Sequence, residues 1–228
     1  AKEDHRWWES ARNALYGASL LLILAVLILA HAFLSDAFEI RYVAQHSSRV
    51  LPFYLKLSAV WAGQEGSIQL WSLLQALFTA LAIGRPPRRA HALVPWATVV
   101  LGIVGAFFIG VTLIFSNPFV RLPHALSDGQ GLNPLLRHPG MVFHPPTMYL
   151  GYVGLSVPFA FAIAALAADP NAPWTTALRG WTLAAWIGLS LGLLLGMRWA
   201  YDVLGWGGYW GWDPVENAGL MPWITTTA

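Results

Sequence analysis

Residues 14–34, ALYGASLLLILAVLILAHAFL, contain no Asp, Glu, Lys or Arg. A helix needs about 20 apolar residues to cross the roughly 30 Å hydrocarbon core of a bilayer. The segment is long enough, so it predicts a membrane-spanning helix. Three further runs of this kind predict spans at 92–115, 147–168 and 180–197.

Two weaker segments extend this pattern. Residues 66–84 are more polar, with Gln69 and Gln75, and a truncated apolar run occupies 218–228. We therefore expect an all-α, polytopic transmembrane helical bundle of about six spans with structured outer loops. Because the last run is cut short and the chain has no initiator Met, we expect a fragment of a longer membrane domain.

The composition agrees with a membrane protein. Hydrophobic residues make up 57% and charged residues 11%, whereas soluble domains carry about 25% charged residues. The net charge of +2 is spread along the chain, so nothing indicates a nucleic-acid partner. The lack of cysteine excludes disulfides, thiolate metal sites and a CxxC redox role for this chain itself.

The positions of the basic residues predict how the spans are oriented in the membrane. Basic residues precede the first span and fill the loop between the second and third spans, namely Lys2, Arg6, Arg12, Arg85, Arg88 and Arg89. By the positive-inside rule these regions are cytoplasmic. Alternation of the spans then places three segments outside, in the periplasm of a Gram-negative cell: about residues 35–65, 116–146 and 198–217.

A tryptophan-rich segment lies in the last outer region. Residues 206–218, WGGYWGWDPVENA, alternate aromatic rings with glycines and end in polar residues. Rings without bulk between them predict a flat apolar platform, and glycines let the backbone approach a planar ligand such as a porphyrin. The candidate ligand-binding residues are Trp206, Gly207, Gly208, Tyr209, Trp210, Gly211, Trp212 and Asp213.

Two alternatives accompany the platform. Aromatic residues also collect at membrane surfaces as an interfacial belt. The polar residues Asp213, Glu216 and Asn217 would either fix an edge of the ligand or cap the following helix.

The segment, with Met221-Pro222-Trp223 after it, resembles the "WWD" signature of haem-handling proteins. Within that superfamily the Asp-Pro-Val-Glu-Asn-Ala and Met-Pro-Trp pieces are similar to the CcmF family, haem-lyase subunits of bacterial cytochrome c maturation. Five upstream blocks resemble the same family, from about residue 35 onward: 42–45, 59–67, 116–121, 128–136 and 144–154. The haem-delivery families CcmC and CcsA depart from this chain after Trp-Asp or Trp-Asp-Pro.

The resemblance implies a function. A CcmF-like protein of the bacterial inner membrane receives haem b on its periplasmic face from the haem chaperone CcmE. It then helps attach the haem to the CxxCH thiols of apocytochrome c, together with CcmH/CcmI-type subunits. The family also holds a stable b-type haem, whose first histidine ligand would lie just beyond Ala228. The alternatives are a haem-delivery protein without bond-forming activity, or a non-haem transporter or structural subunit surrounded by membrane lipid.

His144 is the candidate axial ligand. It begins His-Pro-Pro at the outer mouth of the fourth span, and haem iron readily takes histidine. The resemblance places the family's periplasmic axial histidine at this position, whereas His124 and His138 match no ligand. Because prolines disfavour helix in the residue before them, we expect extended chain here. The alternative role is a residue that simply begins the helix.

Further polar residues have two interpretations each. Arg198 and Asn133 are candidates for the haem propionates, because arginine pairs with carboxylates through a bidentate fork; Arg198 would otherwise snorkel at the membrane edge. Polar residues of the second span share one helical face and would line a haem vestibule or join helices by hydrogen bonds, namely Glu65, Gln69, Ser72 and Thr79. The family has a histidine where this chain has Gln64, so no ligand role transfers there. Pro158 predicts a kink.

Overall fold

The computed structural model describes residues 2–86, 88–205 and 208–228. Within these ranges the regular elements are helical, and Ile40 and Arg121 form an isolated antiparallel bridge. The prediction of an all-α membrane protein is confirmed. The elements are α1 (Lys2–Leu34), α2 (Arg41–His46), α3 (Phe53–Ala59), α4 (Gln64–Gly84), η1 (Arg88–Leu93), α5 (Val94–Ile114), η2 (Pro134–Leu136), α6 (Gly140–Gly154), α7 (Ser156–Ala168), α8 (Trp174–Val203) and α9 (Pro214–Thr227).

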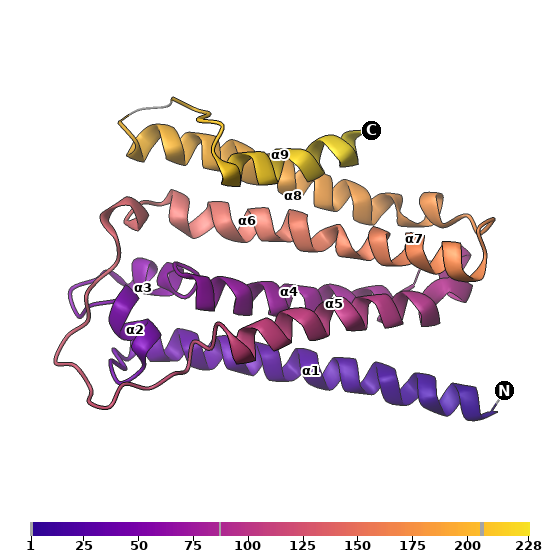
Figure 1. Cartoon of the computed structure of the whole chain (residues 1–228), viewed down its shortest axis with the longest axis horizontal. Coiled ribbons are helices and arrows are strands. Elements are labelled where there is room, and N and C mark those ends of the chain that lie inside the picture. Colours follow the sequence, from indigo (N-terminus) through magenta and orange to yellow (C-terminus); the bar gives the residue numbers. More distant parts are fainter. Residues whose placement is uncertain (1, 87, 206–207) are drawn as a thin grey trace.

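Long apolar helices lie side by side along the molecule (Figure 1). Five segments of the described chain are long and apolar enough to cross a membrane: Arg6–Leu34, Gln64–Gly84, Arg89–Ile114, Gly140–Ala168 and Trp174–Val203. The last apolar run of the sequence, 218–228, falls in α9, which packs on α8. The protein is therefore a multi-pass membrane protein.

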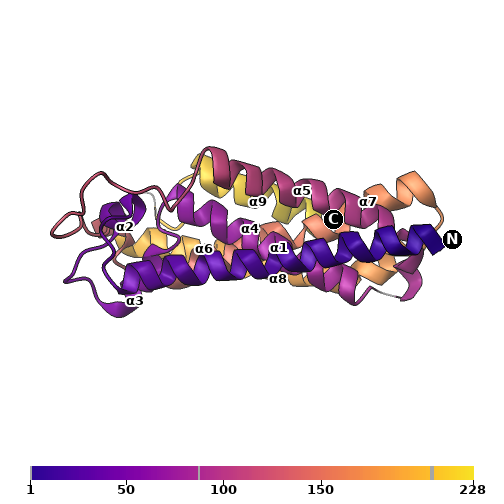
Figure 2. The same ribbon diagram turned by 90° about the horizontal axis from the view of Figure 1, so that it is seen from below.

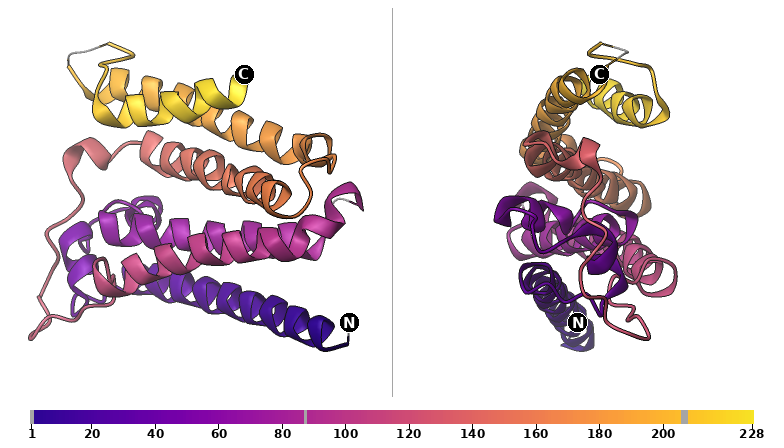
Figure 3. Two further views of the ribbon diagram at one scale, coloured as in Figure 1. Left: turned by 45° about the vertical axis from the view of Figure 1, so that its right-hand side comes forward. Right: turned by 90° about the vertical axis from the view of Figure 1, so that its left-hand side faces the viewer.

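The connections gather at the two ends of the bundle (Figures 1 and 3). One end, called here the α2–α3 end, holds α2, α3, the 115–139 loop and the described residues just before α9, 208–213. The opposite end, called the η1 end, holds the N-terminus, η1 and the 169–173 loop. The described part of the tryptophan-rich segment and helix η1, which follows the basic loop, thus lie at opposite ends.

Each end has its own buried apolar core. At the α2–α3 end the largest fully buried side chains are Leu29, Phe33, Phe38, Tyr42 and Leu132. At the η1 end they are Leu93, Leu101, Phe161 and Leu178. Aromatic and leucine side chains therefore hold the spans together where the connections leave the bundle.

Helix α4 lies centrally, against α1, α5 and α6 (Figure 2). Four of its polar side chains are buried, namely Gln69, Ser72, Gln75 and Thr79, and the Ser72 hydroxyl lies 3.2 Å from the hydroxyl of Thr112 on α5. Thr79 donates to the carbonyl of Gln75 within α4, at 2.7 Å. Only the first of these two contacts joins two helices. Both side-chain amide atoms of Gln69 are buried without a hydrogen-bond partner among the described residues, and Ser72 and Thr79 border a cavity between α1, α4 and α5. Interhelical hydrogen bonding and a cavity lining therefore both stay predictions for this face.

The kink expected at Pro158 appears as a break between two helices. Helix α6 ends at Gly154 and α7 begins at Ser156. Pro158 has no N–H for the carbonyl four residues earlier, that of Gly154, so a continuous helix would lose this hydrogen bond. The fourth span therefore consists of two helical pieces.

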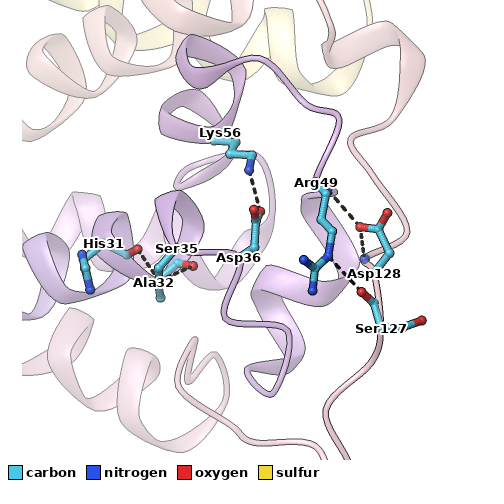
Figure 4. Close-up of polar contacts among 9 residues, drawn as sticks. His31, Ala32, Ser35, Asp36, Arg49, Lys56, Ser127 and Asp128 are labelled. Atoms are coloured by element: carbon cyan, nitrogen blue, oxygen red, sulfur yellow. Dashed lines mark hydrogen bonds and ion pairs between the residues drawn. The ribbon is translucent and has the colours of Figure 1, made fainter.

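The 115–139 loop is fastened to the α2–α3 end (Figure 4). The Asp128 carboxylate accepts from the backbone N–H of Arg49 at 2.9 Å, and the Arg49 guanidinium donates to the Ser127 carbonyl at 3.0 Å. The next residues bond to the backbone of α2, since Gln130 N–H donates to Ala44 O at 2.8 Å. The same view shows Lys56 paired with Asp36 at 2.6 Å. This loop is a fixed part of the structure.

Candidate functional site

A cavity of about 440 Å³ opens at the α2–α3 end, between α6, α8 and the segment before α9. Its volume lies in the range of small-molecule sites, about 300–1,000 Å³. Most of its wall is aliphatic or aromatic, with a few polar groups. The wall includes His144, Met148, Tyr149, Tyr152, Gly196, Trp199, Trp210, Asp213 and Glu216.

His144 lies inside helix α6, which begins at Gly140 and continues through Pro145 and Pro146. The expectation of extended chain at His144 is therefore wrong. Pro145 offers no N–H to the carbonyl of Met141, but the indole N–H of Trp61 donates to that carbonyl at 2.9 Å. A tertiary contact thus replaces the helix hydrogen bond that the proline removes.

The imidazole of His144 is held by α8. Its Nδ1 lies 2.8 Å from the carbonyl oxygen of Gly192. Since a carbonyl only accepts, Nδ1 carries the proton, and in the neutral ring Nε2 keeps its lone pair. No described residue forms a hydrogen bond with Nε2. The ring of Trp199 lies 5.6 Å from that of His144, tilted by 57°.

The tryptophan-rich segment contributes one described ring to the cavity, that of Trp210. Trp206 and Gly207 lie outside the described residues. Tyr209 stacks on Tyr201, with ring centres 4.3 Å apart. The ring of Trp212 is 68% exposed and stands at 83° to that of Trp210. These described rings therefore form no single flat surface.

The polar end of this segment closes on itself. Asp213 accepts from the backbone N–H of Glu216 at 2.7 Å, and Glu216 accepts in return from the backbone N–H of Asp213 at 3.3 Å. This is a capping box with Pro214 in the first helical turn, so it explains where α9 begins. Asn217 donates to the carbonyl of Trp212 at 3.2 Å. The contacts support the helix-capping alternative, although Asp213 and Glu216 also border the cavity.

The two candidate propionate ligands lie outside the cavity wall. Arg198 is exposed and donates to Asp202 at 2.9 Å. It sits between Met197 and Trp199, which do line the cavity, and successive helix residues point about 100° apart. Asn133 instead caps η2 by accepting from the backbone N–H of Leu135 at 3.0 Å. The structure thus brings His144, Trp210 and Asp213 together and leaves Arg198 and Asn133 outside.

The sequence interpretation missed several wall residues. Met148, Tyr149 and Tyr152 follow His144 at helical spacing, which places them on its face of α6. The two prolines concealed this periodicity because they indicated extended chain. The facing glycines of α8, Gly188, Gly192 and Gly196, recur every four residues, a pattern that favours close helix packing.

Comparison with known proteins gives the family. The family described as "Cytochrome C assembly protein" matches residues 61–228. The chain belongs to this family.

Within this family, the chain is similar to proteins named CcmF. The chain is 45% identical to the cytochrome c-type biogenesis protein CcmF of Pseudomonas aeruginosa, over 99% of this chain and 35% of that protein. It is 44% identical to CcmF of Escherichia coli K12, over 100% of this chain and 36% of that protein. A solved structure, "Cytochrome c Heme Lyase CcmF", superposes with a TM-score of 0.81 at 41% identity, covering 97% of this chain and 35% of that one.

These matches confirm the resemblance to CcmF within the cytochrome C assembly family. The chain spans about a third of the length of these relatives. The activity, substrates and partners of a whole protein of this kind are therefore matters of proposal.

Proposed function

We propose that this chain forms the haem-receiving part of a cytochrome c haem lyase. The observation that carries the proposal is that His144 of α6 and Trp210 of the tryptophan-rich segment line one cavity. The relatives named cytochrome c-type biogenesis protein CcmF and cytochrome c haem lyase support the same activity.

The residues of the cavity fit a haem as substrate. His144 offers Nε2 as a neutral axial donor, because its Nδ1 is engaged by Gly192. Aromatic and aliphatic side chains suit the porphyrin faces, and they include Tyr149, Trp199 and Trp210. When bound, the haem supplies vinyl groups to which thiols add. The chain's own residues bind it, orient it and exclude water.

The partners follow from this activity. The haem chaperone CcmE would deliver haem b to the cavity, and apocytochrome c would present its CxxCH thiols with the help of CcmH/CcmI-type subunits. Thioether bonds would then form between the haem vinyl groups and the two cysteines. The full-length protein would also retain a stable b-type haem on histidines outside this chain.

The proposed location is the bacterial inner membrane with the cavity facing the periplasm. Exposed arginines at the η1 end, Arg85 and Arg89, support a cytoplasmic location for that end. The His144 cavity lies at the opposite, α2–α3 end. Haem chaperone and apocytochrome would therefore reach it from the periplasm.

The test is His144→Ala in the full-length protein. We expect loss of the transferred haem and of cytochrome c maturation, while the b-type haem stays. Added imidazole should partly restore haem binding by filling the vacated axial position. His124→Ala is the matched control, because His124 is exposed in the 115–139 loop. Normal maturation by His144→Ala, at normal protein abundance, would contradict the proposal.

A further inference from the structure

We propose that α8 positions His144 through two glycines: the Gly192 carbonyl fixes the tautomer of the ring, and the missing side chain of Gly196 makes room for it. This inference rests on the proposed role of His144 as axial ligand. It names the residues that make Nε2, and not Nδ1, the atom that meets the iron.

The carbonyl of Gly192 is the tautomer-setting group. It lies 2.8 Å from Nδ1 of His144, and within a regular helix it also accepts from the N–H of Gly196, four residues later. A carbonyl oxygen has two lone pairs, so it serves both donors. A histidine that ligates a metal commonly donates its other ring N–H in this way, which fixes the ring orientation and raises the basicity of the ligating nitrogen.

Gly196 leaves the space in which the ring lies. A Cβ at this position would be 2.6 Å from Cε1 and 2.9 Å from Nδ1 of His144. Both distances are too short for carbon contacts, so the imidazole would have to move. The imidazole of His144 already contacts the indole ring of Trp199, so it cannot move in that direction. A methyl group at 196 would thus push Nδ1 away from Gly192 and displace Nε2 from the cavity.

The same packing brings α6 and α8 together along their length. A Cβ on Gly188 would lie 2.8 Å from the backbone nitrogen of Gly151, and one on Gly192 would lie 2.4 Å from the sulfur of Met148. Close approach of the two backbones brings a main-chain carbonyl of α8 within reach of an imidazole on α6. Glycine spacing on one helix therefore determines ligand geometry on the other.

The first measurement is made on the haem-free, full-length protein labelled with ¹⁵N-histidine at neutral pH. The His144 signals, identified by their loss in His144→Ala, should show a protonated Nδ1 and an unprotonated Nε2. The opposite tautomer would overturn the inference. Because the tautomer is read in the wild-type protein and His144→Ala serves only to assign the signals, the result does not depend on Gly196→Ala remaining stable.

The second measurement compares Gly196→Ala with Gly180→Ala for binding of ferric haem b. Gly180 lies on the same helix, and a Cβ there would meet nothing within 4 Å. We expect about 10–100-fold weaker binding to the outer site in Gly196→Ala, with a changed axial-ligand signature in the optical spectrum. Gly180→Ala should bind as the wild type does, and equal binding by Gly196→Ala would overturn the inference.

A double variant separates positioning from general packing. In His144→Ala with added imidazole, the free ligand takes its own position, so adding Gly196→Ala should cause no further loss. An equal loss in this background would mean that Gly196 acts through packing, which overturns the inference. Haem binding by His144→Ala alone at wild-type strength would instead refute the proposed function.

Discussion

The indole N–H of Trp61 donates to the carbonyl oxygen of Met141 across 2.9 Å. This carbonyl lies one turn before Pro145, which has no N–H to offer it. A residue between α3 and α4 therefore completes the first turn of α6, the helix that carries His144. The two segments are 80 residues apart in the sequence, and this hydrogen bond joins them.

We expect Trp61→Phe to lower the free energy of unfolding by about 1–3 kcal/mol. The substitution keeps an aromatic ring in place but leaves the buried carbonyl of Met141 without its donor. The free energy of unfolding in detergent micelles measures this loss. Haem binding at His144 should weaken as well, since the first turn of α6 loosens. Trp96→Phe is the control, because Trp96 is 52% exposed on α5. Equal stability of the two variants would show that the hydrogen bond is dispensable.

Trp210 and Trp212 should contribute unequally to haem binding. Trp210 lines the His144 cavity, whereas Trp212 lies outside its wall and is 68% exposed. One aromatic stacking contact contributes about 0.5–1.5 kcal/mol, so we expect Trp210→Ala to lower haem affinity up to about tenfold. Trp212→Ala should have a smaller effect. Titration of each variant with chaperone-loaded haem tests this order, and the reverse order would contradict the assignment of the cavity.

The orientation is open to direct measurement because the chain has no cysteine. Arg89 of η1 and Leu126 of the 115–139 loop are exposed. Because these two elements lie at opposite ends of the bundle (Figure 1), single cysteines at the two positions report on its two sides. An impermeant thiol reagent added to intact spheroplasts should label Leu126→Cys and spare Arg89→Cys. Both should react after the membrane is opened. Labelling of Arg89→Cys alone would invert the topology.

The attachment of the 115–139 loop should weaken in acid. Backbone N–H groups of Arg49 and Gly129 donate to the Asp128 carboxylate and hold its pKa below the usual value. A group whose folded pKa is lowered stabilises the fold above its unfolded pKa, about 3.9. That contribution is lost as pH falls through the folded pKa.

The difference in unfolding temperature between wild type and Asp128→Asn tests this linkage. It should be constant from pH 5 to 8 and shrink below about pH 4, where both side chains are uncharged. A difference that persists unchanged into acid would show that the Asp128 charge is not what holds the loop.

Much of the fold could be predicted from local sequence. Membrane spans can be predicted from uninterrupted apolar runs, because each span must satisfy its own backbone hydrogen bonds and present apolar side chains to lipid. The break near Pro158 follows from a missing N–H, and the start of α9 follows from the Asp213–Glu216 capping box. These features depend on residues within one or two turns of each other.

The candidate site could be predicted only in part. The types of residue in the motifs indicated haem and singled out His144, but not which neighbours face it. Arg198 was a reasonable candidate by chemistry, yet the helical phase of α8 turns it toward Asp202 and away from the cavity. Its neighbour Trp199 faces the cavity instead.

The sequence by itself determined that the protein is an all-α membrane protein with a tryptophan-rich segment and an axial-ligand candidate. Only the tertiary structure decided that His144 lies within a helix, that Gly192 sets its tautomer, and that Trp210 shares its cavity. The physical reason is that these facts depend on distant donors and acceptors. Pro145 and Pro146 locally disfavour a helix. Pro145 has no N–H for the Met141 carbonyl, and the indole of Trp61, from another segment, donates to that carbonyl instead.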